Sequence, residues 1–237
     1  MKRFWKQAEP VFQDGQWAVM LDGRPVRTPA RVALAVPTEA LARAIADEWN
    51  GVADRIEPRG LPLTGLANAA IDRVSPDRES FATGLGNYAK GDLACYRVEG
   101  PAALVARQEK HWDALLGWAR RRYDVDFRTT VGIVHVDQPA ATVEQLTHAL
   151  AVLDPFRLAG LASLVTIGGS LVAALAVLDM ALPVADAWEA VTVDDRWQLE
   201  QWGADAEAEE ALENRRRDFF AAAHFLKLLS SGVRPIP

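Results

Sequence analysis

Hydrophobic and polar positions alternate along the first 36 residues of the chain, a pattern typical of β-strands with one buried face. Asp14-Gly15 and Asp22-Gly23 are residue pairs that favour tight hairpin turns. The expected strands are Pro10–Gln13, Gln16–Leu21, Arg24–Thr28 and Arg31–Val36. After this pattern ends, Thr38 is a suitable N-cap for the helix that follows it.

A helical period governs most of the chain after Thr38. The expected helices cover residues 64–74, 76–90, 101–123 and 206–229, with further helices from Thr142 onward. Thr142 and Gln145 have the spacing of a capping box, and Pro155 and Pro183 stand where a first helical turn would begin. Two stretches break the helical pattern: Gly91–Val98 is predicted to be extended and Phe127–Val136 to be a strand.

These patterns predict an α+β fold, in which a small β-rich N-terminal domain is followed by a larger, mostly α-helical domain. The composition changes near residue 37, so we expect a β-rich region over residues 1–37 and a mainly helical domain over residues 38–237. Residues 91–98 are an optional extension of the β-rich part.

A run of 21 uncharged residues, Leu158–Leu178, is long enough to cross a membrane. Small residues recur on one face of this run and leucines on another, which is typical of a helix packed inside a bundle. Acidic residues follow it instead of a basic cluster or an aromatic belt. We therefore predict one buried central helix and no stable membrane insertion.

The charge balance and the single cysteine exclude several classes of protein. The chain carries 26 Lys and Arg against 32 Asp and Glu, and its net charge of −6 argues against nucleic-acid binding. One cysteine among 237 residues excludes an internal disulfide and a cysteine-based metal site. The start of the chain lacks the apolar run of a signal peptide, so we expect a cytoplasmic bacterial protein, or a mitochondrial one only if a targeting segment has been removed.

Motifs of catalysis are missing from the sequence. It contains no phosphate-binding glycine loop and no nucleophile elbow, and its four histidines are not spaced as metal ligands. Cys95 remains open as a nucleophile, although a half-buried structural cysteine is the plainer interpretation. Eight tryptophans are the notable feature, because tryptophan is favoured in cores and in protein interfaces alike.

Seven groups of residues, in order between about residue 3 and residue 229, together resemble the Atp12 family, the assembly chaperones of F1-ATPase. They are Arg3–Lys6, Leu21–Pro29, Ala46–Trp49, Pro62–Thr64 with Asn68 and Asp72, Asp92–Arg97, Gln108 with Trp112-Asp113 and Trp118-Ala119, and Gln198 with Trp202-Gly203. Mitochondrial members carry a targeting extension that this sequence does not show, so it looks like a bacterial member.

The resemblance implies a molecular chaperone that binds the free α subunit of F1-ATPase and shields its β-facing surface until assembly. It implies no catalytic residue, metal, cofactor or small-molecule substrate. The implied fold, a small β-rich region and a larger helical one, agrees with the hydrophobic pattern.

Three segments are candidate contact sites for the partner, each with a structural alternative. In the preferred one, acidic residues surround Trp202 at a predicted helix end with Gly203 in a left-handed conformation, although Trp202 would equally serve to cap the bundle. Its candidate residues are Gln198, Glu200, Gln201, Trp202 and Asp205.

The other two candidates lie earlier in the chain. Glu48 and Trp49 end the first helix, where Trp49 shapes the contact surface or belongs to the core. Asp92, Tyr96 and Arg97 form an extended segment that pairs with a strand of the partner or holds an internal ion pair of Arg97 with a helix acid.

Two alternatives from other classes of protein stay open at this point. One is an enzyme that uses Cys95 or an Asp/His pair, and the other is a membrane-attached assembly protein that uses Leu158–Leu178.

Overall fold

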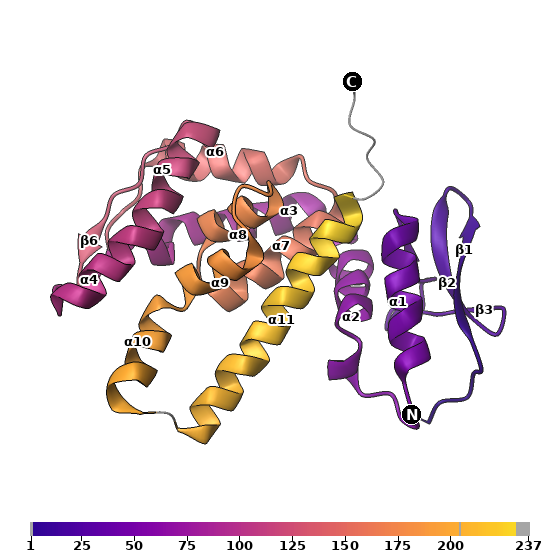
Figure 1. The fold of residues 1–237 in the computed structure, drawn as a ribbon. Helices are drawn as coiled ribbons and strands as arrows, with labels where there is room; N and C mark the ends of the chain where they lie inside the picture. The colour runs from indigo at the N-terminus through magenta and orange to yellow at the C-terminus, as the bar shows by residue number, and fades with distance from the viewer. Residues whose placement is uncertain (1, 204, 231–237) are drawn as a thin grey trace. The chain divides into compact units, whose positions relative to one another are not determined.

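The computed structural model describes residues 2–203 and 205–230, and the chain folds into two compact units. Unit 1 comprises Met1–Arg78, Asp154–Gly160 and His224–Pro237, and unit 2 comprises Glu79–Leu153 and Leu161–Ala223. N-terminal strands are followed by a mostly helical region (Figure 1), so the predicted α+β class is confirmed. The sequence-based division at residue 37 stays a prediction.

Unit 1 begins with a four-stranded antiparallel sheet. Its strands are β1 (Ala8–Gln13), β2 (Gln16–Leu21), β3 (Arg24–Pro25) and β4 (Ala35–Val36). Strand β2 pairs with the other three, so it is the central strand. Asp14 and Asp22 have φ values of 51° and 48°, and each is followed by a glycine with positive φ. The two predicted hairpin turns are therefore confirmed, because this turn type requires positive φ at both central residues.

Helix α1 (Glu39–Gly51) packs against the sheet (Figure 1), and its buried residues include Leu41 and Ile45. The predicted N-cap is confirmed, since the Thr38 hydroxyl accepts a hydrogen bond from the Leu41 N–H at 3.3 Å. Trp49 is 8% exposed, and its ring lies 5.1 Å from that of Trp5, centroid to centroid. Sheet and α1 thus share one core, which places this helix in the same compact unit as the strands.

Shorter helical segments connect α1 to unit 2. These are the 3-10 turn Pro58–Gly60, helix α2 (Pro62–Ala69), the π-helical turn Ala70–Val74, the 3-10 turn Ser75–Asp77 and helix α3 (Arg78–Gly86). They replace the two longer helices predicted over residues 64–74 and 76–90, which are right in type but not in regularity.

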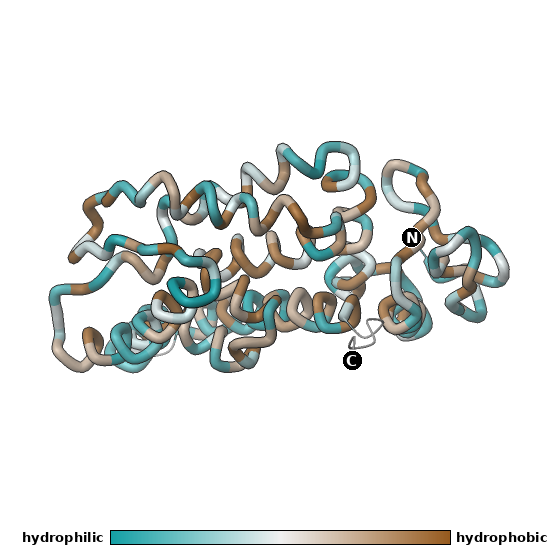
Figure 2. Tube along the Cα trace, turned by 90° about the horizontal axis from the view of Figure 1, so that it is seen from above, coloured by the Kyte–Doolittle hydropathy of each residue, from teal (hydrophilic) through white to brown (hydrophobic). Residues whose placement is uncertain are grey.

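Unit 2 is a bundle of helices with one small parallel sheet. After the 3-10 turns Asn87–Gly91 and Leu93–Cys95, its elements are β5 (Tyr96–Arg97), α4 (Ala102–Gln108), the π-helical turn Glu109–Asp113, α5 (Ala114–Tyr123), β6 (Thr130–Val131), α6 (Ala140–Ala151), α8 (Leu171–Leu178), α9 (Val184–Val191) and α10 (Val193–Trp202). Helices α7 (Pro155–Gly168) and α11 (Ala206–Ser230) contribute residues to both units. Brown and teal residues alternate along these helices in Figure 2, as amphipathic packing requires.

The core of unit 2 consists of large side chains that are almost fully buried. They include Trp112, Leu146, Leu150, Leu161, Leu164, Leu171 and Phe219. Close helix contacts depend on a small residue at Gly86, where an added Cβ would lie 2.1 Å from the Thr147 hydroxyl oxygen. Any side chain at Gly86 would force α3 and α6 apart.

Three predicted elements of unit 2 differ from the structure. The predicted strand Phe127–Val136 pairs only at Thr130–Val131, because its partner β5 is two residues long. Residues 91–98 do not extend the N-terminal sheet, since β5 pairs with β6. Thr142 makes no capping box, because its hydroxyl donates to the Asp126 carbonyl at 2.7 Å and α6 begins at Ala140.

The predicted single helix over residues 158–178 is also wrong. Gly169 has a φ of +69°, which ends α7, and the Ser170 hydroxyl then N-caps α8 by accepting from the Ala173 N–H. Neither helix of this hairpin is as long as the uncharged run itself. Over the residues described, no helix combines the length and the apolar character needed to cross a membrane.

Candidate functional site

Asp92 is a fully buried carboxylate that joins two segments of unit 2. It accepts hydrogen bonds from the Ala94 N–H at 3.0 Å, the Ser170 hydroxyl at 2.9 Å and the Val172 N–H at 3.0 Å. Burial raises the pKa of Asp92, and these donors oppose the rise. Asp92 therefore holds the start of α8 against the turn at Leu93–Cys95, and no partner protein can touch it directly.

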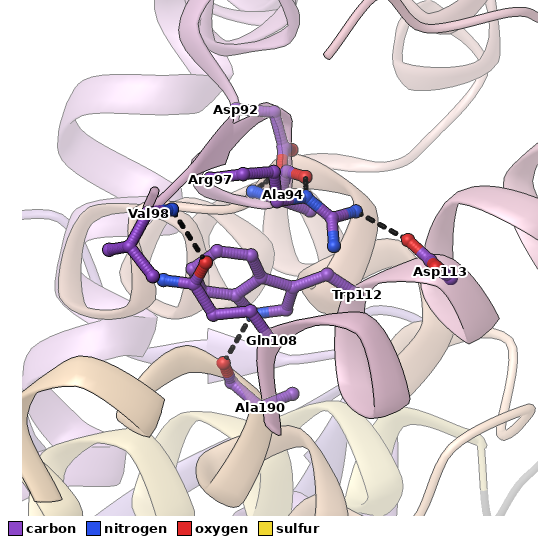
Figure 3. Close-up of polar contacts among 8 residues, drawn as sticks. All are labelled: Asp92, Ala94, Arg97, Val98, Gln108, Trp112, Asp113 and Ala190. Atoms are coloured by element: carbon purple, nitrogen blue, oxygen red, sulfur yellow. Dashed lines mark hydrogen bonds and ion pairs between the residues drawn. The ribbon is translucent and has the colours of Figure 1, made fainter. Parts of the chain in front are cut away.

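Arg97 lies in the strand β5 that follows this turn, and its side chain reaches the helical segment that carries Trp112 and Asp113 (Figure 3). Its Nε donates to the Ala94 carbonyl at 3.1 Å, a terminal N–H donates to Asp113 at 2.7 Å, and the guanidinium stacks 5.3 Å from the centroid of the Trp112 ring. The interpretation of an internal ion pair with a helix acid is confirmed at Asp113. Arg97 thereby fixes the strand to the helix that carries Trp112.

Gln108 and Trp112 lie next to Arg97 and, with Asp92, Arg97 and Asp113, form what we call the polar cluster (Figure 3). The Gln108 side chain accepts from the Val98 N–H at 2.9 Å and donates to Asp194 at 2.8 Å. Trp112 is 1% exposed, and its indole N–H donates to the Ala190 carbonyl at 2.7 Å. These residues bind α4 to α9 and α10, so their role is architectural.

Tyr96 is half-buried, and its hydroxyl lies 3.1 Å from Nδ1 of His135. Strand β6 occupies one edge of β5, so a strand of a partner would have to pair along the opposite edge. Pairing of a partner strand with Asp92, Tyr96 and Arg97 stays a prediction; Asp92 is fully buried, and Tyr96 and Arg97 are half-buried.

Glu48 and Trp49 hold α2 against α1 in unit 1. The carboxylate of Glu48 accepts from the Leu63 N–H at 2.7 Å and from the Thr64 N–H at 2.9 Å, while the Trp49 indole donates to the Thr64 hydroxyl at 3.1 Å. Burial raises the pKa of Glu48, opposed by these hydrogen bonds. Trp49 belongs to the core, so any contribution of it to a contact surface is indirect.

The end of α10 is the exposed candidate site. The Trp202 side chain is 79% exposed, so it does not cap the bundle. Its polar neighbours are exposed as well: Gln198, Glu200, Gln201 and Asp205. Gly203 has the predicted positive φ of 83°, but its ψ of 161° is extended, so the predicted left-handed helical conformation is wrong. A bulky aromatic ring surrounded by carboxylates and amides faces solvent here.

One of these residues already has a partner within the chain. Glu200 forms an ion pair with Arg107 at 2.7 Å, and this hydrogen-bonded pairing lowers the pKa of Glu200. The Arg107 guanidinium in turn stacks over the Trp197 ring at 4.9 Å. Helical spacing cannot reveal a pair that bridges α4 and α10, and sequence analysis missed both Arg107 and the Gln108–Asp194 bond.

Cys95 is fully buried, and burial raises the pKa of its thiol to about 12. Such a thiol stays protonated at neutral pH and is a poor nucleophile. Within the range that the structure describes, no group of three or more His, Cys, Asp or Glu side chains is placed to hold a metal ion.

The family described as "ATP12 chaperone protein" matches residues 2–120 of the chain. The chain belongs to the Atp12 chaperone family. The resemblance of its seven residue groups is thereby confirmed, and this Atp12 family member is an assembly chaperone of ATP synthase, not an enzyme. The hypothesis of an enzyme based on Cys95 or an Asp/His pair is accordingly wrong.

Relatives of the Atp12 family share most of the chain. The mitochondrial protein atp12 of Schizosaccharomyces pombe is 26% identical over 221 residues, which cover 88% of this chain and 76% of that protein. The crystal structure of Atp12 from Paracoccus denitrificans is 40% identical, with a TM-score of 0.90 and coverage of 96% of this chain and 98% of that one. A mutant of the same P. denitrificans protein is 39% identical, also with a TM-score of 0.90, over 96% and 97% of the two chains.

Proposed function

We propose that this Atp12 family chaperone binds the free α subunit of F1-ATPase and covers the surface that α later presents to the β subunit. The observation that carries the proposal is the exposed Trp202 ring at the end of α10, within a chain that shares its fold with Atp12. Tryptophan is enriched among the residues that dominate protein interfaces, and a ring that is mostly in water contributes little to the core.

The physical need for such a chaperone follows from the nature of its client. A subunit of an obligate oligomer has a large apolar interface, often above about 2,000 Å², which water contacts until assembly. Exposed apolar patches of that size promote aggregation. A chaperone that covers the patch stabilises the free subunit by a free energy that grows with the logarithm of the chaperone concentration over the dissociation constant. The β subunit then displaces the chaperone.

The contact surface of the proposal is the α10 end, formed by Gln198, Gln201, Trp202 and Asp205, with Glu200 at its border. Trp202 supplies apolar area, and the carboxylate of Asp205 supplies charge at the rim. Since Glu200 is already paired with Arg107, a client cation would have to compete for it. We place the chaperone in the bacterial cytoplasm, where its client is made.

The proposal is tested by size-exclusion chromatography of the purified chain with the purified α subunit. We expect a complex with the unaltered chain and a weaker one with Asp205→Lys or with Glu200→Lys, while circular dichroism shows the same helical content. If both variants retain α as well as the unaltered chain does, the α10 end is not the contact surface. If the unaltered chain forms no complex, the α subunit is not the client.

A further inference from the structure

A groove of about 480 Å³ lies between α10 and α11 in unit 2. Its apolar lining residues are Trp188, Leu199 and Leu212, and the rest of its lining is charged: Glu189, Glu200, Glu209, Glu213, Arg196 and Arg216. Trp188 is buried, whereas the two leucines are only half-buried and keep apolar surface in contact with water. We call this feature the α10–α11 groove.

Helix α10 and the first part of α11, which form the groove, have few core contacts. Of the ten residues of α10, only Val193 is buried. In α11, residues 206–211 are all exposed, and the first buried side chain is Phe219. Helices in globular proteins owe most of their stability to packing of an apolar face, so this hairpin lacks the packing that ordinarily maintains one.

Ion pairs across the surface hold the hairpin in place instead. Arg215 pairs with Asp195 at 3.0 Å, and Arg196 pairs with Glu189. Exposed pairs of this kind each contribute at most about 1 kcal/mol. Figure 1 shows α10 and the start of α11 as two separate rods. The arrangement leaves a surface on which another polypeptide can pack.

The charge along the groove indicates what that polypeptide carries. From Asp205 to Glu213 the chain has five acidic residues and no Lys or Arg: Asp205, Glu207, Glu209, Glu210 and Glu213. Glu209 and Glu213 line the groove, and its two arginines, Arg196 and Arg216, are each paired with a glutamate of the same lining. Among the described ion pairs, only Glu213 of these five takes part, with Arg216. Acidic residues in a first helical turn also stabilise the helix dipole, but that effect falls off after one turn, whereas these carboxylates extend over two.

We propose that the α10–α11 groove receives a basic amphipathic helical segment of the client. Its aliphatic side chains would pack on Leu199 and Leu212, and its Lys or Arg side chains would face Glu209 in the lining and the exposed Glu210 next to it in the chain. The inference rests on the proposed function, because it takes the free α subunit as the client. A helix laid into an apolar groove with charged rims is a recurring mode of peptide recognition. Complementary charge at such a rim accelerates association and selects the partner.

The test is the affinity of the α subunit for the double variant Glu209→Lys, Glu210→Lys, measured by isothermal titration calorimetry. We expect binding to weaken at least about tenfold, which corresponds to about 1.4 kcal/mol. The matched control is Glu144→Lys, an exposed glutamate near the start of α6. The control is expected to bind like the unaltered chain, and the unaltered chain is expected to lose affinity as salt rises.

Two results of this titration overturn the proposal in distinguishable ways. If α binds the double variant with unchanged affinity, the groove is not the docking site, but the proposed chaperone function is not contradicted. Failure of the unaltered chain to bind α removes the client and the groove together.

A cross-linking experiment covers the case in which the double variant does not fold. Glu209→Cys introduces an accessible thiol for a photoreactive label, and the buried Cys95 does not compete for it. We expect cross-links to a segment of α that contains Lys or Arg. Cross-links to α no more frequent than those from a Glu144→Cys control would overturn the proposal.

Discussion

The polar cluster around Trp112 and the hairpin of α10 and the first part of α11 belong to the same compact unit but are built in opposite ways. In the cluster, Asp92 and Trp112 are buried and each polar atom discussed has a partner within the chain. In the hairpin, Trp202 is 79% exposed and several carboxylates have no ion pair among the described residues. One region uses its side chains for folding, and the other presents them to water.

The difference shows what a family resemblance detects in a protein that works by binding. Four of the residues that carry the resemblance, Asp92, Arg97, Gln108 and Trp112, lie in the buried cluster, where each has several contacts to satisfy. The residues proposed to touch the client have few contacts of their own. The resemblance also includes Gln198 and Trp202 in the hairpin, which the proposal assigns to recognition of the client.

Among the variants that test this comparison, Trp112→Ala is expected to change stability the most. The substitution removes a fully buried ring and its hydrogen bond to the Ala190 carbonyl, so we expect the free energy of unfolding to fall by about 3–5 kcal/mol. Urea denaturation followed by circular dichroism measures this change. A loss below about 1 kcal/mol would show that the cluster does not hold unit 2 together.

A smaller effect, with a dependence on pH, is expected from Asp92→Asn. Burial raises the pKa of Asp92 in the folded state above its value in the unfolded chain. As the pH rises from about 4, Asp92 loses its proton in the unfolded chain at a lower pH than in the folded protein. The folded protein therefore loses stability relative to the unfolded chain until the pH has passed the folded pKa of Asp92. The variant lacks this contribution.

The measurement is denaturation of both proteins across that pH range. The wild type is expected to exceed Asp92→Asn in stability most at the acidic end, with a difference that shrinks toward neutral pH. A difference that instead grows with pH would mean that the three hydrogen bonds to the carboxylate outweigh its burial.

Trp202→Ala is expected to change stability by no more than about 0.5 kcal/mol, because the ring is mostly in water already. Binding of the α subunit is expected to weaken, since an exposed tryptophan gains buried area only in the complex. Thermal melting and a pull-down of α measure the two quantities. If this variant binds α as tightly as the unaltered chain does, Trp202 does not contact the α subunit, and the proposed difference between hairpin and cluster fails.

No effect is expected when the native protein is treated with iodoacetamide. The Cys95 thiol is buried, and its pKa is raised to about 12, so the reactive thiolate is scarce. Mass spectrometry is expected to find labelling only after denaturation. Rapid labelling of the native chain would show that Cys95 is accessible to solvent. It would contradict the placement of Cys95 and its neighbours in the core.

Local signals predicted the fold well where a single residue decides the backbone. Thr38 caps α1 as expected, Pro155 begins α7, and the last helix begins at Ala206. The two hairpin turns follow from Asp-Gly pairs that tolerate positive φ. Each of these outcomes depends on neighbours in the sequence and not on distant partners.

Three predictions failed where a distant partner decides the outcome. The β-branched run Phe127–Val136 becomes a strand only at Thr130–Val131, because β5 offers no longer edge to pair with. The Thr142 hydroxyl bonds to Asp126 in place of its own helix. At the candidate site, exposure of Trp202 and pairing of Glu200 with Arg107 likewise depend on how helices meet, which a helical period does not encode.

The most direct test of the central claim, that this chain keeps a free α subunit from aggregating, is light scattering of purified α subunit diluted from denaturant. With an equimolar amount of the chain, we predict that scattering is suppressed and that α elutes in a complex with it. Scattering as strong as with an equal amount of an unrelated protein would contradict the account.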